Sequence, residues 1–366
     1  MRVEDRLRHA APPDAAAAQE RAERVIGAVA VPGRRRRRWP AAGVVAATLA
    51  AVVAMTPPGD AVARWVRDLV TTTDHAPPAP QPVLGSLPGR GRLLVGGASG
   101  AFVVGPGGTR HRIGAFDDLA WSPRGLFVAG TRGDTLAAVA PDGAPQWTVT
   151  RDAVVADPAW ARTGYRVAYR SGTDLRVVAG DGSGDHPLAS NVADLPAAWA
   201  PGRHHWLVAA HTNGSVQEYH ADDPSYRGWA VGGGPVRALQ WTRSHHVVIV
   251  RAHHLQVVCG GGCVQRNPLP PVDHAVIAHD GQRLAIATGR TVRLLAIRDG
   301  DERALAQRVL LKADAPVEAM AFSPDGSRLL VTSRDQWVFV PLRPPARITA
   351  AKVRGFPVFG GWCCER

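Results

Sequence analysis

Six basic residues recur once per unit of a repeat that fills most of the chain, each in a polar turn that follows an apolar stretch. They are Arg132, Arg170, His211, Arg251, Arg290 and Arg334. Acidic residues stand in the loops that lead into the following unit, at Asp117, Asp118, Asp152, Asp157, Asp194, Asp273 and Asp314. If the units align, these turns and loops share one face and form a polar, partly cationic basin for an anionic or peptidic ligand. The alternative is that they are solvated turn residues in ion pairs worth ~0–1 kcal/mol each.

The four cysteines offer redox chemistry but lack the spacing of a metal site. Cys259 and Cys263 are separated by three glycines, so a disulfide across a hairpin tip is predicted, as an oxidising compartment would permit. A bridge between the adjacent Cys363 and Cys364 is not expected, because it would be strained. The alternative is that all four thiols are free.

No residues with the pattern of a catalytic or metal centre are recognised. The histidine pairs His204-His205, His245-His246 and His253-His254 include two that stand at turn positions of consecutive units, which favours exposed residues far apart. No Gly-x-Ser-x-Gly elbow and no sialidase Asp-box occurs. We therefore predict no metal, no cofactor and no enzymatic activity.

A repeated phrase indicates the elements that position these turns. Ala120 to Ala129 (AWSPRGLFVA) returns as Ala159 to Ala168 and, more loosely, in four further units. Each copy of the phrase contains one large apolar residue, which we call the anchor of its unit. Successive anchors are 36 to 45 residues apart, which fits the ~40–45 residues of a four-stranded propeller blade. The anchors are Trp121, Trp160, Trp199, Trp241, Ile277 and Phe322.

A seventh anchor, Trp362, has no room for further strands behind it. Three strands without an anchor, Arg92–Val95, Ala101–Val104 and Thr109–Ile113, precede the first full unit. Joining the last strand to these three would close the ring. The sequence therefore predicts an all-β, seven-bladed β-propeller over residues 91–366, with six blades as the alternative.

The turns, most clearly Phe322-Ser323-Pro324-Asp325-Gly326, resemble the WD40-like repeats of the TolB/PD40 propeller group. The resemblance spans about residues 90–366, but the units of Trp241 and Ile277 depart from it. The Gly-His and Trp-Asp dipeptides of true WD40 repeats are missing. The resemblance implies a fold and little about function, because propellers host many roles.

The N-terminal segment has the pattern of a signal-anchor. Arg34 to Arg38 precede an uncharged stretch, so a transmembrane helix is predicted over residues 39–56, with residues 1–38 in the cytoplasm and a short helix within 14–29. A Pro-rich linker, 57–90, follows. The alternatives are a signal peptide cleaved near Ala61-Val62-Ala63, or a buried core helix.

The net charge of +12 is partly local, since residues 1–56 hold 10 Arg against 5 acids. No Lys/Arg-rich helix interleaved with aromatics occurs, so nucleic acid is not a predicted partner. We predict a monomeric binding or scaffold propeller at the outer face of the cytoplasmic membrane, with a protein, peptide or anionic cell-envelope ligand. One alternative is a transmembrane regulator that couples the propeller to a cytoplasmic partner, such as a sigma factor, through residues 1–33. Another is a secreted propeller enzyme.

Overall fold

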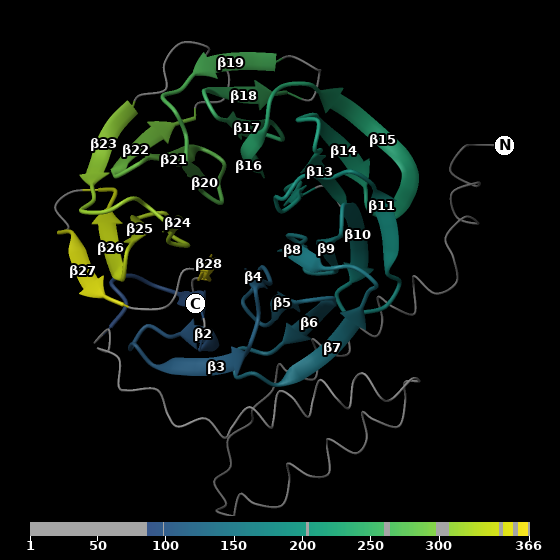
Figure 1. Ribbon diagram of the computed structural model, residues 1–366, viewed down its shortest axis with the longest axis horizontal. Coiled ribbons are helices and arrows are strands. Elements are labelled where there is room, and N and C mark those ends of the chain that lie inside the picture. The colour runs from purple at the N-terminus through teal and green to yellow at the C-terminus, as the bar shows by residue number, and fades with distance from the viewer. Residues whose placement is uncertain are drawn as a thin grey trace, which may run out of the picture. The chain divides into compact units, whose positions relative to one another are not determined.

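Seven four-stranded antiparallel sheets surround a central opening (Figure 1). The computed structural model describes residues 86–97, 99–202, 205–259, 264–297, 307–343, 347–353 and 358–364. The predicted all-β architecture of seven blades is confirmed, and the six-bladed alternative is wrong. The predicted segments 14–29 and 39–56, and the linker up to residue 85, lie outside the described residues. Within the described ranges, no helix has the length and apolar character needed to span a membrane.

The first six blades are built from consecutive strands in chain order. Blades 1 to 3 are β4 (Asp118–Trp121), β5 (Val128–Arg132), β6 (Thr135–Val139), β7 (Pro145–Thr150); β8 (Val155–Trp160), β9 (Arg166–Ser171), β10 (Asp174–Ala179), β11 (His186–Ala189); and β12 (Ala198–Trp199), β13 (Trp206–Ala210), β14 (Val216–His220), β15 (Asp223–Val231). Blades 4 to 6 are β16 (Val236–Trp241), β17 (Val247–Arg251), β18 (His254–Val258), β19 (Val264–Pro268); β20 (His274–Ile277), β21 (Arg283–Thr288), β22 (Thr291–Ala296), β23 (Gln307–Lys312); and β24 (Ala319–Phe322), β25 (Arg328–Ser333), β26 (Gln336–Pro341), β27 (Thr349–Lys352).

Blade 7 joins the two ends of the repeat region. Its innermost strand is the last in the chain, β28 (Val358–Cys363), and the other three are the first, β1 (Arg92–Gly97), β2 (Gly100–Val104) and β3 (Arg110–Gly114). Trp362 pairs with Leu93 in an antiparallel register. The predicted closure is therefore confirmed, and the ring has no unpaired blade.

The anchor residues occupy equivalent positions. Each pairs with a fully buried residue of the second strand of its blade: Trp121 with Val128, Trp160 with Val167, Trp199 with Leu207, Trp241 with Val247, Ile277 with Leu284, Phe322 with Leu329 and Trp362 with Leu93. The apolar clusters lie between neighbouring blades rather than within one. One cluster, for example, combines Leu175 and Val177 of blade 2 with Trp199 of blade 3. The middle strands are consequently covered on both faces, whereas outer strands such as β15 and β19 are largely exposed.

Two of the indoles also link neighbouring blades by hydrogen bonds. Trp199 Nε1 donates to the carbonyl of Ala159, 2.9 Å away, and Trp241 Nε1 donates to the carbonyl of Ala198 at 3.0 Å. In both cases the acceptor is the residue just before the anchor of the preceding blade. The same side chain therefore fills the wedge between two blades and fixes their relative position.

The repeated Ser and Gly of the turn phrase have identifiable roles. Ser122 Oγ and Ser323 Oγ each accept a hydrogen bond of 2.9 Å from the amide five residues later, which ties together the two ends of the turn. Gly125 and Gly326 adopt φ of 63° and 61°, a left-handed conformation that a side chain disfavours. Each glycine amide also donates to the carbonyl three residues earlier. The repeated phrase thus encodes the hairpin between the first two strands in blades 1 and 6.

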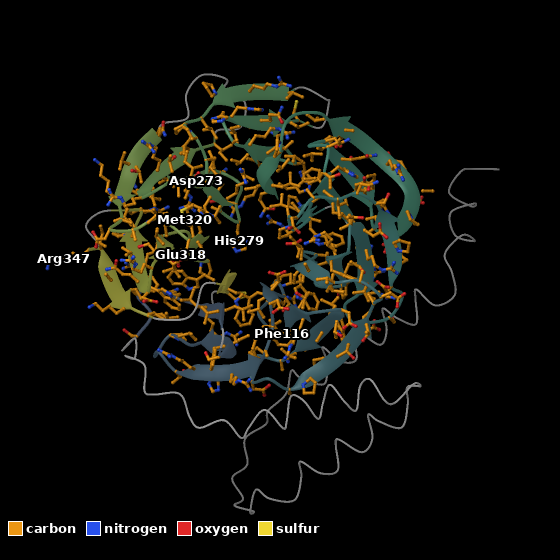
Figure 2. The ribbon with its side chains drawn as sticks, in the orientation of Figure 1. Phe116, Asp273, His279, Glu318, Met320 and Arg347 are labelled. Carbon is orange, nitrogen blue, oxygen red and sulfur yellow. A yellow bond between two sulfur atoms is a disulfide. The ribbon has the colours of Figure 1, made fainter. Side chains whose placement is uncertain are left out.

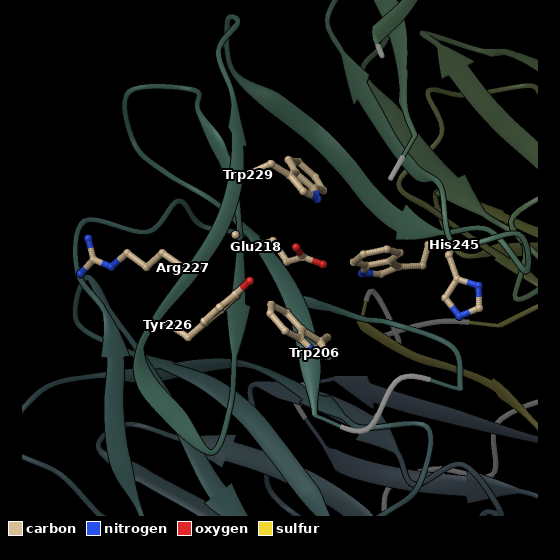
Figure 3. A pocket seen from close by; sticks show the side chains of 8 residues that line it. Trp206, Glu218, Tyr226, Arg227, Trp229 and His245 are labelled. Carbon is tan, nitrogen blue, oxygen red and sulfur yellow. The ribbon is translucent and has the colours of Figure 1, made fainter. Parts of the chain in front are cut away.

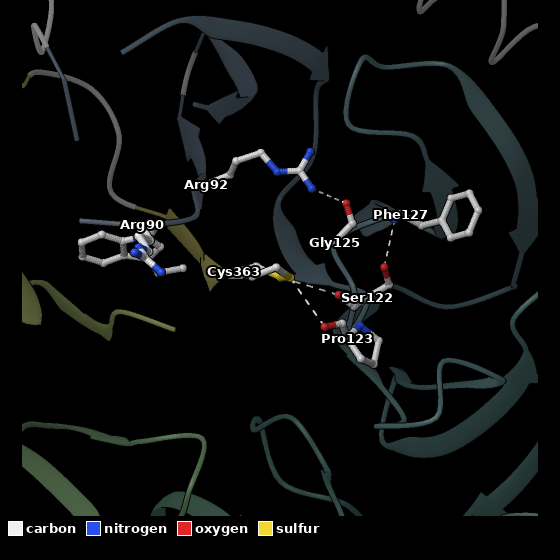
Figure 4. The surroundings of a disulfide bond; sticks show 9 residues. Arg90, Arg92, Ser122, Pro123, Gly125, Phe127 and Cys363 are labelled. Carbon is white, nitrogen blue, oxygen red and sulfur yellow. Dashed lines mark hydrogen bonds between the residues drawn. A yellow bond between two sulfur atoms is a disulfide. The ribbon is translucent and has the colours of Figure 1, made fainter. Parts of the chain in front are cut away.

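The end of β28 reaches blade 1, and there the structure corrects an expectation. Cys363 and Cys364 are joined by a disulfide, although no bridge was predicted between them. Cys364 adopts a left-handed φ of 75° directly after the strand, and this turn brings its side chain back to Cys363. Cys363 Sγ lies 3.7 Å from the carbonyl oxygen of Ser122, and Cys364 Sγ lies 3.5 Å from that of Pro123 (Figure 4). Cys259 is disulfide-bonded, but Cys263 lies outside the described residues, so their pairing stays a prediction.

We expect substitution of Trp362 to weaken the closure of the ring in graded steps. Trp362 is 2% exposed, and its Nε1 donates to the carbonyl of Arg90 at 2.9 Å. Trp362→Phe removes mainly that hydrogen bond and should lower the free energy of unfolding by about 1 kcal/mol. Trp362→Ala also leaves a cavity against Phe339 and should cost about 3–5 kcal/mol. Urea denaturation measures both, and equal stability of Trp362→Ala and the wild type would contradict this role.

Candidate functional site

One face of the propeller gathers the turns between the second and third strands of the blades, and the loops that lead into each innermost strand. A recurrent hydrogen bond joins the two. The amides of Gly133, Gly289 and Arg334 donate to the carboxylates of Asp117, Asp273 and Glu318 at 3.3, 2.7 and 3.1 Å. An acid at the start of the innermost strand therefore orients the neighbouring turn. Each of these bonds uses one carboxylate oxygen.

At the centre of this face lies a cavity of about 430 Å³, lined by the starts of the innermost strands of blades 4 to 6 and by the loops that lead into the innermost strands of blades 3, 5 and 6. Its lining carries three carboxylates and one guanidinium, which makes it predominantly acidic. Figure 2 shows Asp273, Glu318 and Met320 beside the central opening. The lining residues are Asp194, Leu195, Val236, Arg237, Asp273, His274, Ala275, Glu318, Ala319 and Met320.

The opposite end of the axis is crossed by side chains. Arg162, in the turn after the anchor of blade 2, donates from Nη2 to the carbonyl of His279 in blade 5, 2.8 Å away. Burial lowers the pKa of His279, and the neighbouring Arg162 cation lowers it further. The His279 ring is therefore neutral at neutral pH. Because this contact crosses the axis, the acidic cavity is the better candidate for a binding site.

Three of the six predicted basin residues are engaged within the fold. Arg170 donates from Nε to Asp157 at 2.8 Å and also pairs with Asp194. Burial raises the pKa of Asp157, and the Arg170 partner opposes that rise. His211 contacts the Tyr219 hydroxyl at 2.6 Å, and burial lowers its pKa, so it adds no positive charge at neutral pH.

Arg251 is the most deeply buried of the six, at 1% exposure. It donates from Nε to Gln256 Oε1 at 2.6 Å and from Nη1 to the carbonyls of Gly214, at 2.9 Å, and Gly234. A side chain at Gly233 would overlap the Arg251 guanidinium, at 2.5 Å from its central carbon. Arg251 thus connects loops of blades 3 and 4 rather than facing solvent.

The other three predicted residues, Arg132, Arg290 and Arg334, are exposed on the same face. None of the six lines the central cavity. Their role in capturing a ligand stays a prediction.

Sequence analysis missed Glu318, Arg237 and His274 as lining residues. A periodic signal could have found the first two, because Arg237, Asp273 and Glu318 each stand four residues before their anchor. Strand residues alternate between faces, so a fixed distance from the anchor places these side chains at the same height on the axis. Among the described residues, no group of three His, Cys, Asp or Glu side chains could hold a metal ion.

No protein-family model matches the sequence, and no curated protein matches it. Solved structures do match. One is the β-propeller domain of Cps50 (Swd1) from Myceliophteria thermophila, with 14% identity and a TM-score of 0.52 over 64% of this chain and 86% of that chain. Another is the C-terminal WD40 domain of Sif2, with 16% identity and a TM-score of 0.54 over 70% of this chain and 79% of that chain. At this identity the similarity establishes the WD40-type propeller fold alone.

We predict that Arg251 is a structural residue. Arg251→Met should lower the free energy of unfolding by about 2–4 kcal/mol, because buried carbonyls lose a charged donor. Arg132→Met is the matched control, since Arg132 stands at the same register in blade 1 but is exposed, and it should cost less than about 0.5 kcal/mol. Denaturant unfolding of both variants is the measurement. Equal costs would contradict the assignment.

Proposed function

We propose that the chain is a non-catalytic binding or scaffold propeller that takes a basic segment of a partner protein or peptide at its central cavity. The acidic lining of that cavity is the observation that carries this proposal. The lining carries Asp194, Asp273 and Glu318 with the guanidinium of Arg237. Asp194 is also paired with Arg170, so the acidic excess comes from Asp273 and Glu318. Convergent carboxylates attract cations and speed encounter with basic partners.

An anionic ligand fits this cavity less well. It would have to use arginines that do not line the cavity, and Arg170 and Arg251 are already paired within the fold. The carboxylates that hold the turns retain oxygens able to accept from lysine or arginine side chains. Residues of four blades line the cavity, and this extended lining suits an extended peptide.

The proposal also places the propeller outside the cytoplasmic membrane, anchored by residues 39–56. The support is in the sequence, where Arg34 to Arg38 immediately precede an uncharged apolar stretch. Clustered cations hold their side of a span in the cytoplasm. The propeller, which follows that stretch, would then face outward, where disulfides persist.

Neutralising the rim should weaken capture of a basic peptide. In the full-length protein, the double variant Asp273→Asn with Glu318→Gln keeps the oxygens that accept the turn amides but removes two charges. We expect ~10-fold weaker binding of a fluorescent oligolysine peptide, measured by anisotropy at low salt, because the attraction is electrostatic.

The matched control is Asp142→Asn, because Asp142 holds a turn on the other face by accepting from the amide of Ala144 at 3.0 Å. It should leave binding unchanged. Equal affinity of the double variant and the wild type would remove the central cavity as the site.

The anchor can be tested by reporter fusion. Alkaline phosphatase, which is active only after export, should be active when fused after residue 85 and inactive when fused after residue 33. Replacing Arg34 to Arg38 by glutamine should reduce the activity of the first fusion, because the positive charges set the orientation. Recovery of the residue-85 fusion in the membrane fraction supports an anchor, and its release points to a cleaved signal. Activity of the residue-33 fusion would contradict the proposed orientation.

A further inference from the structure

The disulfide between Cys363 and Cys364 lies at the junction of blade 7 with blade 1 (Figure 4). Cys363 is the last residue of β28 and pairs with Arg92 of β1, and Cys364 follows it in the left-handed turn. The carbonyl oxygens nearest to the two sulfur atoms belong to Ser122 and Pro123, in the turn after β4. The bridge therefore stands where the two ends of the repeat region are joined.

Stabilisation of the fold does not account for this bridge. A disulfide stabilises a protein mainly by constraining the unfolded chain, and more so when it closes a longer loop. Neighbouring cysteines close the shortest loop that a chain allows, so the unfolded state is hardly restricted. Cys364 must also adopt a left-handed backbone conformation, which a side chain disfavours. The chemistry of the pair explains its presence better than cross-linking does.

The surroundings of the bridge suit the reduced pair as well as the oxidised one. The sulfur atoms of a disulfide carry no hydrogen, so they cannot donate to the carbonyl oxygens that face them. After reduction each sulfur carries a hydrogen, and the carbonyls of Ser122 and Pro123, at 3.7 and 3.5 Å, are within reach of these weak S–H donors. Reduction therefore adds two weak hydrogen bonds to acceptors that are already in place.

Gly125 leaves the space that the two sulfur atoms occupy. A Cβ at this position would lie 2.9 Å from Cys364 Sγ, 3.3 Å from Cys363 Sγ and 2.8 Å from Arg92 Nη2. The Arg92 guanidinium is thus close to both sulfur atoms, and a cation there favours a thiolate as the leaving group. The turn of blade 1 provides room for the bridge and electrostatic support for opening it.

The two sulfur atoms differ in access from solvent. Cys363 is 8% exposed, whereas Cys364 is only partly buried. An incoming thiolate therefore reaches the sulfur of Cys364 first.

We propose that Cys363 and Cys364 form a reversible thiol–disulfide exchange site that is reduced by a dithiol. A thiolate of the dithiol attacks Cys364 Sγ, the S–S bond breaks, and Cys363 leaves as a thiolate and takes up a proton. The second thiolate of the reductant then attacks the mixed disulfide and releases Cys364, which is protonated in turn. Two electrons and two protons pass to the cysteine pair, and the dithiol becomes a disulfide. A monothiol lacks the second step, so the adjacent Cys363 thiolate displaces it again.

The test equilibrates the full-length protein with mixtures of reduced and oxidised dithiothreitol and then blocks free thiols with N-ethylmaleimide. Mass spectrometry of the C-terminal peptide gives the fraction that is reduced. We expect a reversible two-electron transition in protein that urea denaturation shows to be folded. Absence of the bridge in the oxidising mixtures, or its reduction only in unfolded protein, would overturn the proposal.

Gly125→Ala should shift this equilibrium toward the dithiol by ~10-fold or more, because free cysteine side chains can turn away from the added methyl group whereas a disulfide fixes both sulfur atoms. Gly164→Ala is the matched control. Gly164 belongs to the corresponding turn of blade 2 and has a φ of 83°, but a Cβ there meets only Pro123 Cδ, at 4.0 Å. It should leave the equilibrium unchanged. An unshifted equilibrium in folded Gly125→Ala contradicts the site.

Tryptophan fluorescence tests the site without changing Gly125. A disulfide quenches the fluorescence of a nearby indole, and Trp121 directly precedes Ser122 at this junction. Reduction should therefore raise the fluorescence of the native protein, and Trp121→Phe should diminish the rise. The rise should be absent from Cys364→Ser, which cannot form the bridge. A rise of wild-type size in folded Cys364→Ser would assign it to another disulfide and overturn the proposal.

Trp229→Phe is the matched control for Trp121→Phe. Trp229 lines a cavity of about 680 Å³ between blades 3 and 4, where Figure 3 shows it with Trp206 and Tyr226. This cavity is formed by blades that do not adjoin blade 7. Trp229→Phe should therefore leave the rise on reduction unchanged.

Discussion

The pairing of β28 with β1 is the interaction on which the rest of the structure depends. A blade buries its apolar faces against its two neighbours, so an open ring would leave two faces in water. The register of Trp362 with Leu93 completes blade 7 and covers both. Arg92 strengthens this junction, since its Nη2 donates to the carbonyl of Gly125 at 2.5 Å and its guanidinium lies 5.0 Å from the centroid of the Trp121 ring. Contacts more than 240 residues apart in sequence thereby stabilise every interface between blades.

Closure also determines the geometry of the candidate sites. Because the anchors are in equivalent registers, the residues four positions before them lie at one height around the axis. There the negative charges of Asp273 and Glu318 outweigh the positive charge of Arg237. The acidic residues there serve two purposes. One carboxylate oxygen orients a neighbouring turn, and the charge of the carboxylate contributes to the negative electrostatic potential of the central cavity. A rim held by such bonds is preorganised, which lowers the entropic cost of binding a flexible segment.

The sequence predicted the blade count because each blade needs one large apolar residue, and the spacing from Trp121 to Trp362 displays that need directly. It could not separate Arg251 from Arg132. Both residues end the second strand of a blade, but the close approach of Gly214, Gly233 and Gly234 buries only Arg251. The conformation of those loops depends on tertiary packing. Glu218 stands at a register that is apolar in the other six blades, but Val216 to His220 has the mixed pattern of an ordinary half-exposed strand. The register that makes Glu218 exceptional becomes visible only when the seven blades are aligned.

Departures from the repeat are therefore more informative than the repeat itself. Residues that all blades share are explained by the packing of wedges, and a change at a buried position must be stabilised locally. Arg251 is such a change, and the fold compensates for it with Gln256 and backbone carbonyls, which is the arrangement of a structural cation.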